Sequence, residues 1–160
     1  MHQEYQLQAH GEDAMVALGM QFGCALGAVG RGAVVFLHGD LGMGKTTFTR
    51  GVLRHFGHKG AAKSPTYTLV EPYEFDLQRV HHFDLYRLGH PEELEYLGIR
   101  DYFDGQGISL IEWPDKGAGY LPSADIVLNI TALDRGRDLV FKASSALGIA
   151  VLQSMECAAE

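Results

Sequence analysis

The sequence has few cysteines, no excess of positive charge and no long apolar run, and each shortage excludes a class of protein. Two cysteines in 160 residues, Cys24 and Cys157, are too few for a disulfide framework and are expected to be reduced thiols. Thirteen Lys and Arg against twenty Asp and Glu give a net charge of −7, which argues against a broad nucleic-acid-binding surface. No stretch approaches the roughly 20 apolar residues of a membrane span, and the first residues lack the basic region of a signal peptide. We therefore expect a cytoplasmic protein that makes no membrane contact.

The composition that remains is typical of one globular domain spanning residues 1–160. A chain that is 46% hydrophobic and of this length buries enough surface to fold without a disulfide or a metal ion. Twenty glycines against five prolines indicate many tight turns rather than disorder.

Apolar periodicity predicts an α/β fold with a mainly parallel central sheet and an antiparallel hairpin. A helix is expected from Glu12 to Leu26, ended by Gly27 and Gly30. The continuous apolar run 33–37 is typical of a strand covered on both faces. Segments 67–75 and 80–86, joined by four residues, predict the hairpin. Further elements are expected at 5–7 (an edge strand), 45–56 (a helix), 91–95 (a helix start), 108–111, 125–130 and 138–142 (strands) and from about 145 (a helix).

Residues 39–46 match the phosphate-binding P-loop pattern G-x-x-x-x-G-K-[ST]. Glycines let backbone amides turn inward around an anion, and the helix that begins at Lys45 adds its positive end. The Lys45 ammonium can contact the β- and γ-phosphates, the Thr46 hydroxyl can bind Mg²⁺, and Thr47 can reach the α-phosphate. Because the pattern lies between a buried strand and an amphipathic helix, a P-loop NTPase is predicted. The candidate nucleotide-binding residues here are Asp40, Leu41, Gly42, Met43, Gly44, Lys45, Thr46 and Thr47.

Two acids end predicted strands and can complete such a site. Glu112 follows the run 108–111, which is the more apolar of the two and is therefore expected beside the P-loop strand. This favours Glu112 as the carboxylate on the metal side. Asp84 follows the run 80–83. It is then expected to be a catalytic acid, a switch residue or a residue that contacts the metal ligands rather than the metal. For both residues the alternative is a strand-end carboxylate in solvent.

Other polar residues nearby are more ambiguous. Ser64-Pro65-Thr66 follows the P-loop helix, where a switch loop can place a hydroxyl on Mg²⁺ or the γ-phosphate, although the segment can equally be a polar turn. His81 and His82 point to opposite faces of a strand, which disfavours a shared metal and leaves His82 on the face of Asp84. Trp113, the only tryptophan, is expected either to anchor the core or to lie at the site beside Glu112.

The base and the reaction leave alternatives open. No Asn-Lys-x-Asp run is present to recognise guanine, so ATP is favoured over GTP. A small-molecule kinase with a P-loop is the main alternative to an ATP-driven switch. Such a kinase needs an arginine-bearing lid, whereas the stretch 99–104 is poor in cations and the basic cluster 135–137 comes late. A nucleotide-gated binding module without catalysis is a third possibility.

Four motifs in this order resemble the bacterial TsaE family, the ATPase component of tRNA threonylcarbamoyladenosine synthesis. They are residues 39–47, 64–71, 82–87 and 112–114, and the resemblance covers roughly residues 12–130. It implies a cytoplasmic Mg²⁺-dependent ATPase that works with the TsaB and TsaD proteins. TsaD modifies the adenosine next to the tRNA anticodon, TsaB is its scaffold, and the ATP cycle resets the complex between turnovers. Contact with tRNA would come only through these partners.

The resemblance also assigns residues. The family's Mg²⁺ ligands map onto Thr46 and Glu112, its functional acid onto Asp84, and its switch onto the segment that contains Thr66. Lys45, Asp84 and Glu112 are thus the expected catalytic residues. Glu12 matches the adenine-side start of the first helix, and Arg137 matches a late loop on the same side. Met15 stands where the family often has Thr, and the match fades after Ile130.

Overall fold

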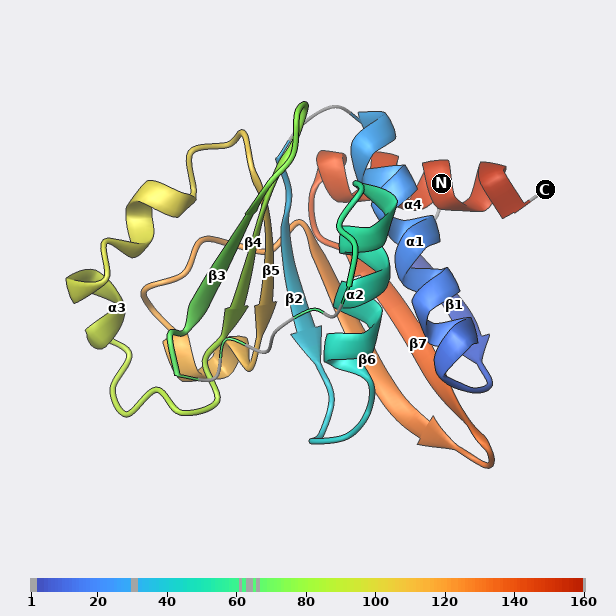
Figure 1. Ribbon diagram of the computed structural model, residues 1–160, viewed down its shortest axis with the longest axis horizontal. Helices are drawn as coiled ribbons and strands as arrows, with labels where there is room; N and C mark the ends of the chain where they lie inside the picture. The colour runs from blue at the N-terminus through green and yellow to red at the C-terminus, as the bar shows by residue number, and fades with distance from the viewer. Residues whose placement is uncertain (1–2, 30–31, 61, 63–64, 66, 160) are drawn as a thin grey trace.

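A seven-stranded mixed sheet forms the centre of the molecule. The computed structural model describes residues 3–29, 32–60, 62, 65 and 67–159, with the strands in the order β1-β7-β6-β2-β5-β4-β3 (Figure 1). The strands are β1 (Glu4–Ala9), β2 (Val34–His38), β3 (Val70–Glu74), β4 (Arg79–Asp84), β5 (Ile108–Glu112), β6 (Ile126–Leu133) and β7 (Gly136–Ala143). The predicted α/β class is therefore confirmed.

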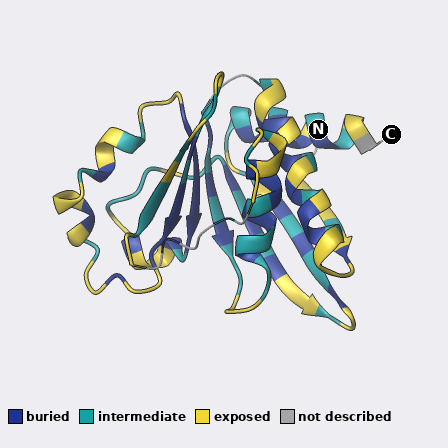
Figure 2. Cartoon of the chain, in the orientation of Figure 1, coloured by how far each residue is buried: buried dark blue, intermediate teal, exposed yellow. Residues whose placement is uncertain are grey.

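The middle of the sheet is parallel and its edges are antiparallel. Strand β2 pairs in parallel with β5 on one side and β6 on the other, and β4 pairs in parallel with β5. Strand β3 joins β4 as the predicted antiparallel hairpin, while β7 and β1 extend the other edge antiparallel. The central strands are the most buried part of the sheet (Figure 2). As the apolar content of 108–111 predicted, β5 lies beside the P-loop strand β2.

Two clusters of apolar side chains cover the two faces of the sheet. Helices α1 (Glu12–Val29), α2 (Lys45–His55) and α4 (Ala146–Ala159) form the larger core with one face. The short helices α3 (Glu93–Tyr96), η1 (Ile99–Tyr102) and η2 (Pro114–Gly117) lie near a smaller core on the other face, around Phe83 and Ile111. Side chains alternate along each strand, so Val35 and Leu37 join the larger core while Val34 and Phe36 contact the smaller one.

Helices α1 and α2 cross at two glycines. A Cβ added at Gly19 would overlap the carbonyl oxygen of Phe48, and one added at Gly51 would overlap the carbonyl oxygen of Val16. The backbones approach this closely because neither glycine has a side chain. The crossing fixes the position of α2, whose first residues belong to the P-loop motif.

Several element boundaries differ from the predicted ones, and the three largest changes concern α1, β3 and α3. Helix α1 continues through Gly27, because this glycine does not adopt the positive φ with which a glycine ends a helix. Strand β3 begins only at Val70, since Leu69 has a positive φ of 68° that interrupts the extended backbone. The helix expected from residue 91 is the four-residue α3, preceded by amides of Gly89 and His90 that donate to the Glu93 carboxylate.

Candidate functional site

The P-loop connects β2 to α2 at the carboxyl end of the parallel strands. Gly42 and Gly44 have positive φ values of 81° and 104°, a conformation that favours glycine. The Met43 amide donates to the Asp40 carbonyl over 3.2 Å and closes the turn. Helix α2 begins directly after Gly44, and the amides of its first turn have no acceptor within the helix. Together these features provide the backbone setting that an anion-binding nest requires.

Lys45 is held inside the site. It is 5% exposed, its Nζ donates to the Gly39 carbonyl over 2.5 Å, and the same nitrogen lies 3.9 Å from the centroid of the Trp113 ring. Burial lowers the pKa of Lys45, because removal from water disfavours the charged ammonium. The negative charges of Glu112, Asp84 and Asp40 oppose that shift.

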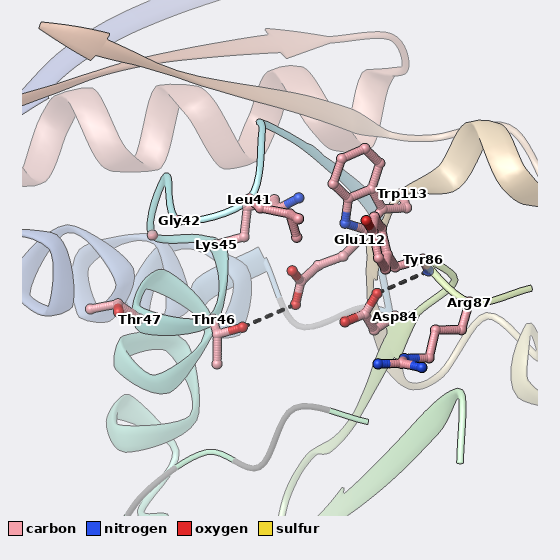
Figure 3. A pocket seen from close by; sticks show the side chains of 11 residues that line it. Leu41, Gly42, Lys45, Thr46, Thr47, Asp84, Tyr86, Arg87, Glu112 and Trp113 are labelled. Atoms are coloured by element: carbon pink, nitrogen blue, oxygen red, sulfur yellow. Dashed lines mark hydrogen bonds between the residues drawn. The ribbon is translucent and has the colours of Figure 1, made fainter. Parts of the chain in front are cut away.

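The two predicted acids meet at the ends of neighbouring strands. Asp84 of β4 is the register partner of Glu112 of β5, and they are 7% and 3% exposed. The Thr46 hydroxyl donates to Glu112 Oε2 over 3.5 Å, and Asp84 Oδ1 accepts the amide of Tyr86 over 3.0 Å (Figure 3). Neither acid is a solvent-exposed strand end.

A cavity of about 430 Å³ lies between the P-loop and these strand ends. Its lining comprises Leu41, Gly42, Gly44, Lys45, Thr46, Thr47, Asp84, Tyr86, Arg87, Glu112 and Trp113. Most of the predicted site residues are therefore brought together, whereas Asp40 and Met43 line a neighbouring cavity of about 370 Å³. Tyr86 and Arg87 were not predicted as site residues, although their position directly after Asp84 was a signal. The Arg87 guanidinium lies 4.9 Å from the centroid of the Tyr67 ring.

A third cavity, of about 500 Å³, lies on the other side of the loop and contains both residues expected near adenine. Arg137 donates from Nε to the Met43 carbonyl and from Nη2 to the Gly42 carbonyl, over 3.3 and 3.4 Å. Glu12 forms an ion pair of 2.5 Å with Arg50 of α2. Met15 is buried beside Gly44, so an apolar side chain lies against the loop on this side.

The structure describes some of the remaining candidate site residues and leaves others outside the described part of the chain. Thr66 and Ser64 lie outside the described residues. His81 and His82 point to opposite faces as predicted: His81 packs against Tyr102, while His82 is fully buried and contacts Glu112. Trp113 combines both expected roles, since it packs at the edge of the smaller core and also lines the cavity.

The oxygen atoms of Thr46 and Glu112 fit a magnesium ion that is also bound by a nucleotide. Mg²⁺ prefers hard oxygen ligands and is usually held by one or two protein groups together with phosphate oxygens and waters. Thr46 and Glu112 supply two oxygens 3.5 Å apart. Within residues that the structure describes, no group of three or more His, Cys, Asp or Glu could hold a metal ion by itself. The described helices also include none with the length and apolar character needed to cross a bilayer.

The sheet order, the loop and the strand-end acids define a P-loop protein of the α/β class. Comparison with known proteins narrows this class. The sequence profile described as "Threonylcarbamoyl adenosine biosynthesis protein TsaE" matches residues 9–139. The chain belongs to the TsaE family, which acts in the biosynthesis of threonylcarbamoyladenosine in tRNA.

Individual relatives support this membership. The chain is 56% identical over 115 residues to the tRNA threonylcarbamoyladenosine biosynthesis protein TsaE of Haemophilus influenzae, covering 72% of this chain and 73% of the relative. It is 39% identical over 113 residues to the TsaE protein of Bacillus subtilis, covering 70% of each chain. The crystal structure of Bacillus subtilis YdiB superposes with a TM-score of 0.80 at 26% identity, over 100% of this chain and 99% of that one. The resemblance found in the sequence is thus confirmed.

Proposed function

We propose that this chain is an Mg²⁺-dependent ATPase whose nucleotide cycle resets a complex of TsaB and TsaD during modification of tRNA next to the anticodon. The observation that carries the proposal is the convergence of Lys45, Thr46, Asp84 and Glu112 on one cavity beside the P-loop. Membership of the TsaE family supports the pathway. The net charge of −7 agrees with contacts made mainly to proteins, so tRNA would be reached only through the partners.

Each residue has a role that follows from its position. The amides of the P-loop and the Lys45 ammonium bind phosphate oxygens. Thr47 lies two residues after Lys45 in the same helix turn. Thr46 and Glu112 would hold the metal ion, which would supply positive charge to the phosphates. Asp84 offers a second carboxylate that can orient a water molecule. Glu12 and Arg137 line the adenine side, and Thr66 remains a predicted contact of the switch segment.

A reconstituted complex provides the test. Phosphate release from ATP is measured with this chain, TsaB and TsaD of the same organism and tRNA, and we expect Lys45→Ala to abolish it because the β/γ contact is lost. Lys142→Ala, at an exposed position of β7, is the matched control and should retain full activity.

Three results would contradict the proposal. Equal phosphate release by the Lys45→Ala complex would show that the P-loop is not the site of hydrolysis. Transfer of labelled phosphate to a metabolite without partners would identify a kinase. Tight ATP binding with no phosphate release in the full complex would identify a nucleotide-gated binding module.

A further inference from the structure

A buried histidine outside the P-loop motif contacts the carboxylate on the metal side. His82 of β4 has no exposed side-chain surface, and its Nε2 lies 2.5 Å from Oε2 of Glu112, whose side chain is 4% exposed. The sequence placed His82 only on the strand face of Asp84. Its partner turns out to be the residue that the proposed function places on Mg²⁺.

The sheet register explains how the contact arises. Asp84 pairs with Glu112 at the strand ends, and His82 pairs with Leu110 one step deeper in the sheet. Alternation places His82, Asp84 and Glu112 on the same face, which is the face that α2 covers. The imidazole therefore supports the Glu112 carboxylate from inside the protein, on the side away from the cavity mouth.

The surroundings of the imidazole define which atom donates. His82 Nδ1 is buried and has no hydrogen-bond partner among the residues that the structure describes. The Glu112 carboxylate is a hydrogen-bond acceptor, so the ring hydrogen that faces it is carried by Nε2. That N–H donates to Oε2 of Glu112. The Thr46 hydroxyl donates to the same oxygen, so neither contact engages Oε1.

We propose that His82 is a positioning residue for the metal site: its imidazole fixes the Glu112 carboxylate in the orientation that holds Mg²⁺. The proposal rests on the proposed function. Hydrogen-bond partners behind a metal ligand commonly contribute about 10–100-fold to metal affinity or activity. Without the imidazole, the Glu112 side chain keeps the longer contact with the Thr46 hydroxyl, and the metal would have to supply more of its ordering. This weakens metal binding without altering the phosphate contacts of the P-loop.

Two amide substitutions separate this role from simple filling of the core. In His82→Gln the side-chain amide extends to about the position of Nε2, whereas in His82→Asn it ends near Nδ1 and cannot reach Glu112. We expect His82→Asn to weaken Mn²⁺ binding to the ADP complex about 10–100-fold, measured by electron paramagnetic resonance, and His82→Gln to restore most of it. ADP affinity without metal, measured by calorimetry, should stay within about twofold for both variants. His81→Asn, at the adjacent position on the opposite face, is the control and should leave Mn²⁺ binding unchanged.

The outcomes distinguish this inference from the proposed function. Equal Mn²⁺ affinity of the Gln and Asn variants would overturn the positioning role. So would a loss of metal-free ADP affinity as large as the loss of Mn²⁺ affinity. Both variants keep a polar side chain of similar size. Their melting temperatures identify any loss of Mn²⁺ binding that comes from unfolding. If the unsubstituted protein binds neither ADP nor ADP with Mn²⁺, the proposed function itself fails.

Discussion

The ammonium of Lys45 lies 3.9 Å from the centroid of the Trp113 ring. Trp113 follows Glu112 directly and has a positive φ of 57°, which brings its ring over the P-loop rather than onward along the strand direction. A cation above an indole face is stabilised by about 0.5–2 kcal/mol, depending on desolvation. The ammonium that we propose as a phosphate ligand is therefore held by an aromatic ring and by the Gly39 carbonyl.

Nucleotide binding should change the fluorescence of Trp113. Phosphate oxygens compete for the Lys45 ammonium, so its contact with the indole weakens when ATP or ADP binds. Because Trp113 is the only tryptophan, the signal reports this one site. We expect a saturable change in emission during nucleotide titration. It should be absent in Lys45→Ala, and an unchanged emission while calorimetry detects binding would contradict the prediction.

Replacing Lys45 by Met should raise the melting temperature of the ligand-free protein. Burial lowers the pKa of Lys45 below the ordinary value of 10.5, so folding disfavours its charged form. Between the folded pKa and 10.5 the unfolded chain binds more protons at Lys45, so the contribution of this residue to stability rises with pH. The advantage of Lys45→Met should therefore shrink as pH rises from neutrality towards 10.5. Calorimetric melts across that range check this; a constant difference, or a less stable variant, would disprove it.

The two acids should separate in their effects on turnover and metal binding. Glu112→Gln removes the charge of the metal-side carboxylate, so we expect hydrolysis in the reconstituted complex to fall about 100-fold or more and Mg²⁺ dependence to shift to higher concentration. Asp84→Asn should reduce hydrolysis with little shift in Mg²⁺ dependence. The two proposed metal ligands, Thr46 and Glu112, are both kept in this variant, together with the hydrogen bond between them. Rates measured over a Mg²⁺ series decide the matter. Asp101→Asn, at an exposed position, serves as the control; identical Mg²⁺ profiles for the two acid variants would refute the division of roles.

Arg137 should support nucleotide affinity through the loop. Its guanidinium donates to the carbonyls of Gly42 and Met43, and each hydrogen bond to a charged group is worth about 1.5–3 kcal/mol. We expect Arg137→Met to weaken ADP binding about 10-fold, because the loop must then be ordered by the ligand. Calorimetry measures this affinity. Arg100→Met, which replaces a side chain that is 85% exposed, should have no effect, and equal affinities for the two variants would exclude the role.

Substitution at the crossing of α1 and α2 should destabilise the protein. A Cβ at Gly19 would overlap the Phe48 carbonyl, and overpacking of this kind costs about 1–3 kcal/mol of unfolding free energy. Urea unfolding of Gly19→Ala should show a lower midpoint. Gly27→Ala, on the same helix, adds a Cβ whose nearest neighbours are side-chain atoms, the Phe56 ring at 3.3 Å and His55 Nε2 at 3.8 Å. Side chains can shift where a backbone carbonyl cannot, so the higher helix propensity of alanine should leave stability equal or greater. A Gly19→Ala variant as stable as Gly27→Ala would show that the helices can separate.

Local patterns determined the elements of the sheet and the motif at its edge. The apolar run before Gly39 predicted the P-loop strand, and the higher apolar content of 108–111 placed Glu112 beside it, because a central parallel strand is covered on both faces. The boundary at β3 could not be predicted in this way. Leu69 adopts a left-handed conformation that nothing in its residue type favours. Its amide donates to the Pro65 carbonyl four residues earlier, and its carbonyl accepts the amide of Asp84 at the end of β4.

The sequence by itself determined the α/β class, the P-loop and the family, because these depend on periodicity and on the spacing of neighbouring residues. Only the tertiary structure decided which groups meet at the site. Arg137 reaches the loop from β7, 94 positions along the chain from Met43, and His82 reaches Glu112 across 30 positions. Such contacts depend on strand order and register, which bring distant segments together and which local pattern does not encode.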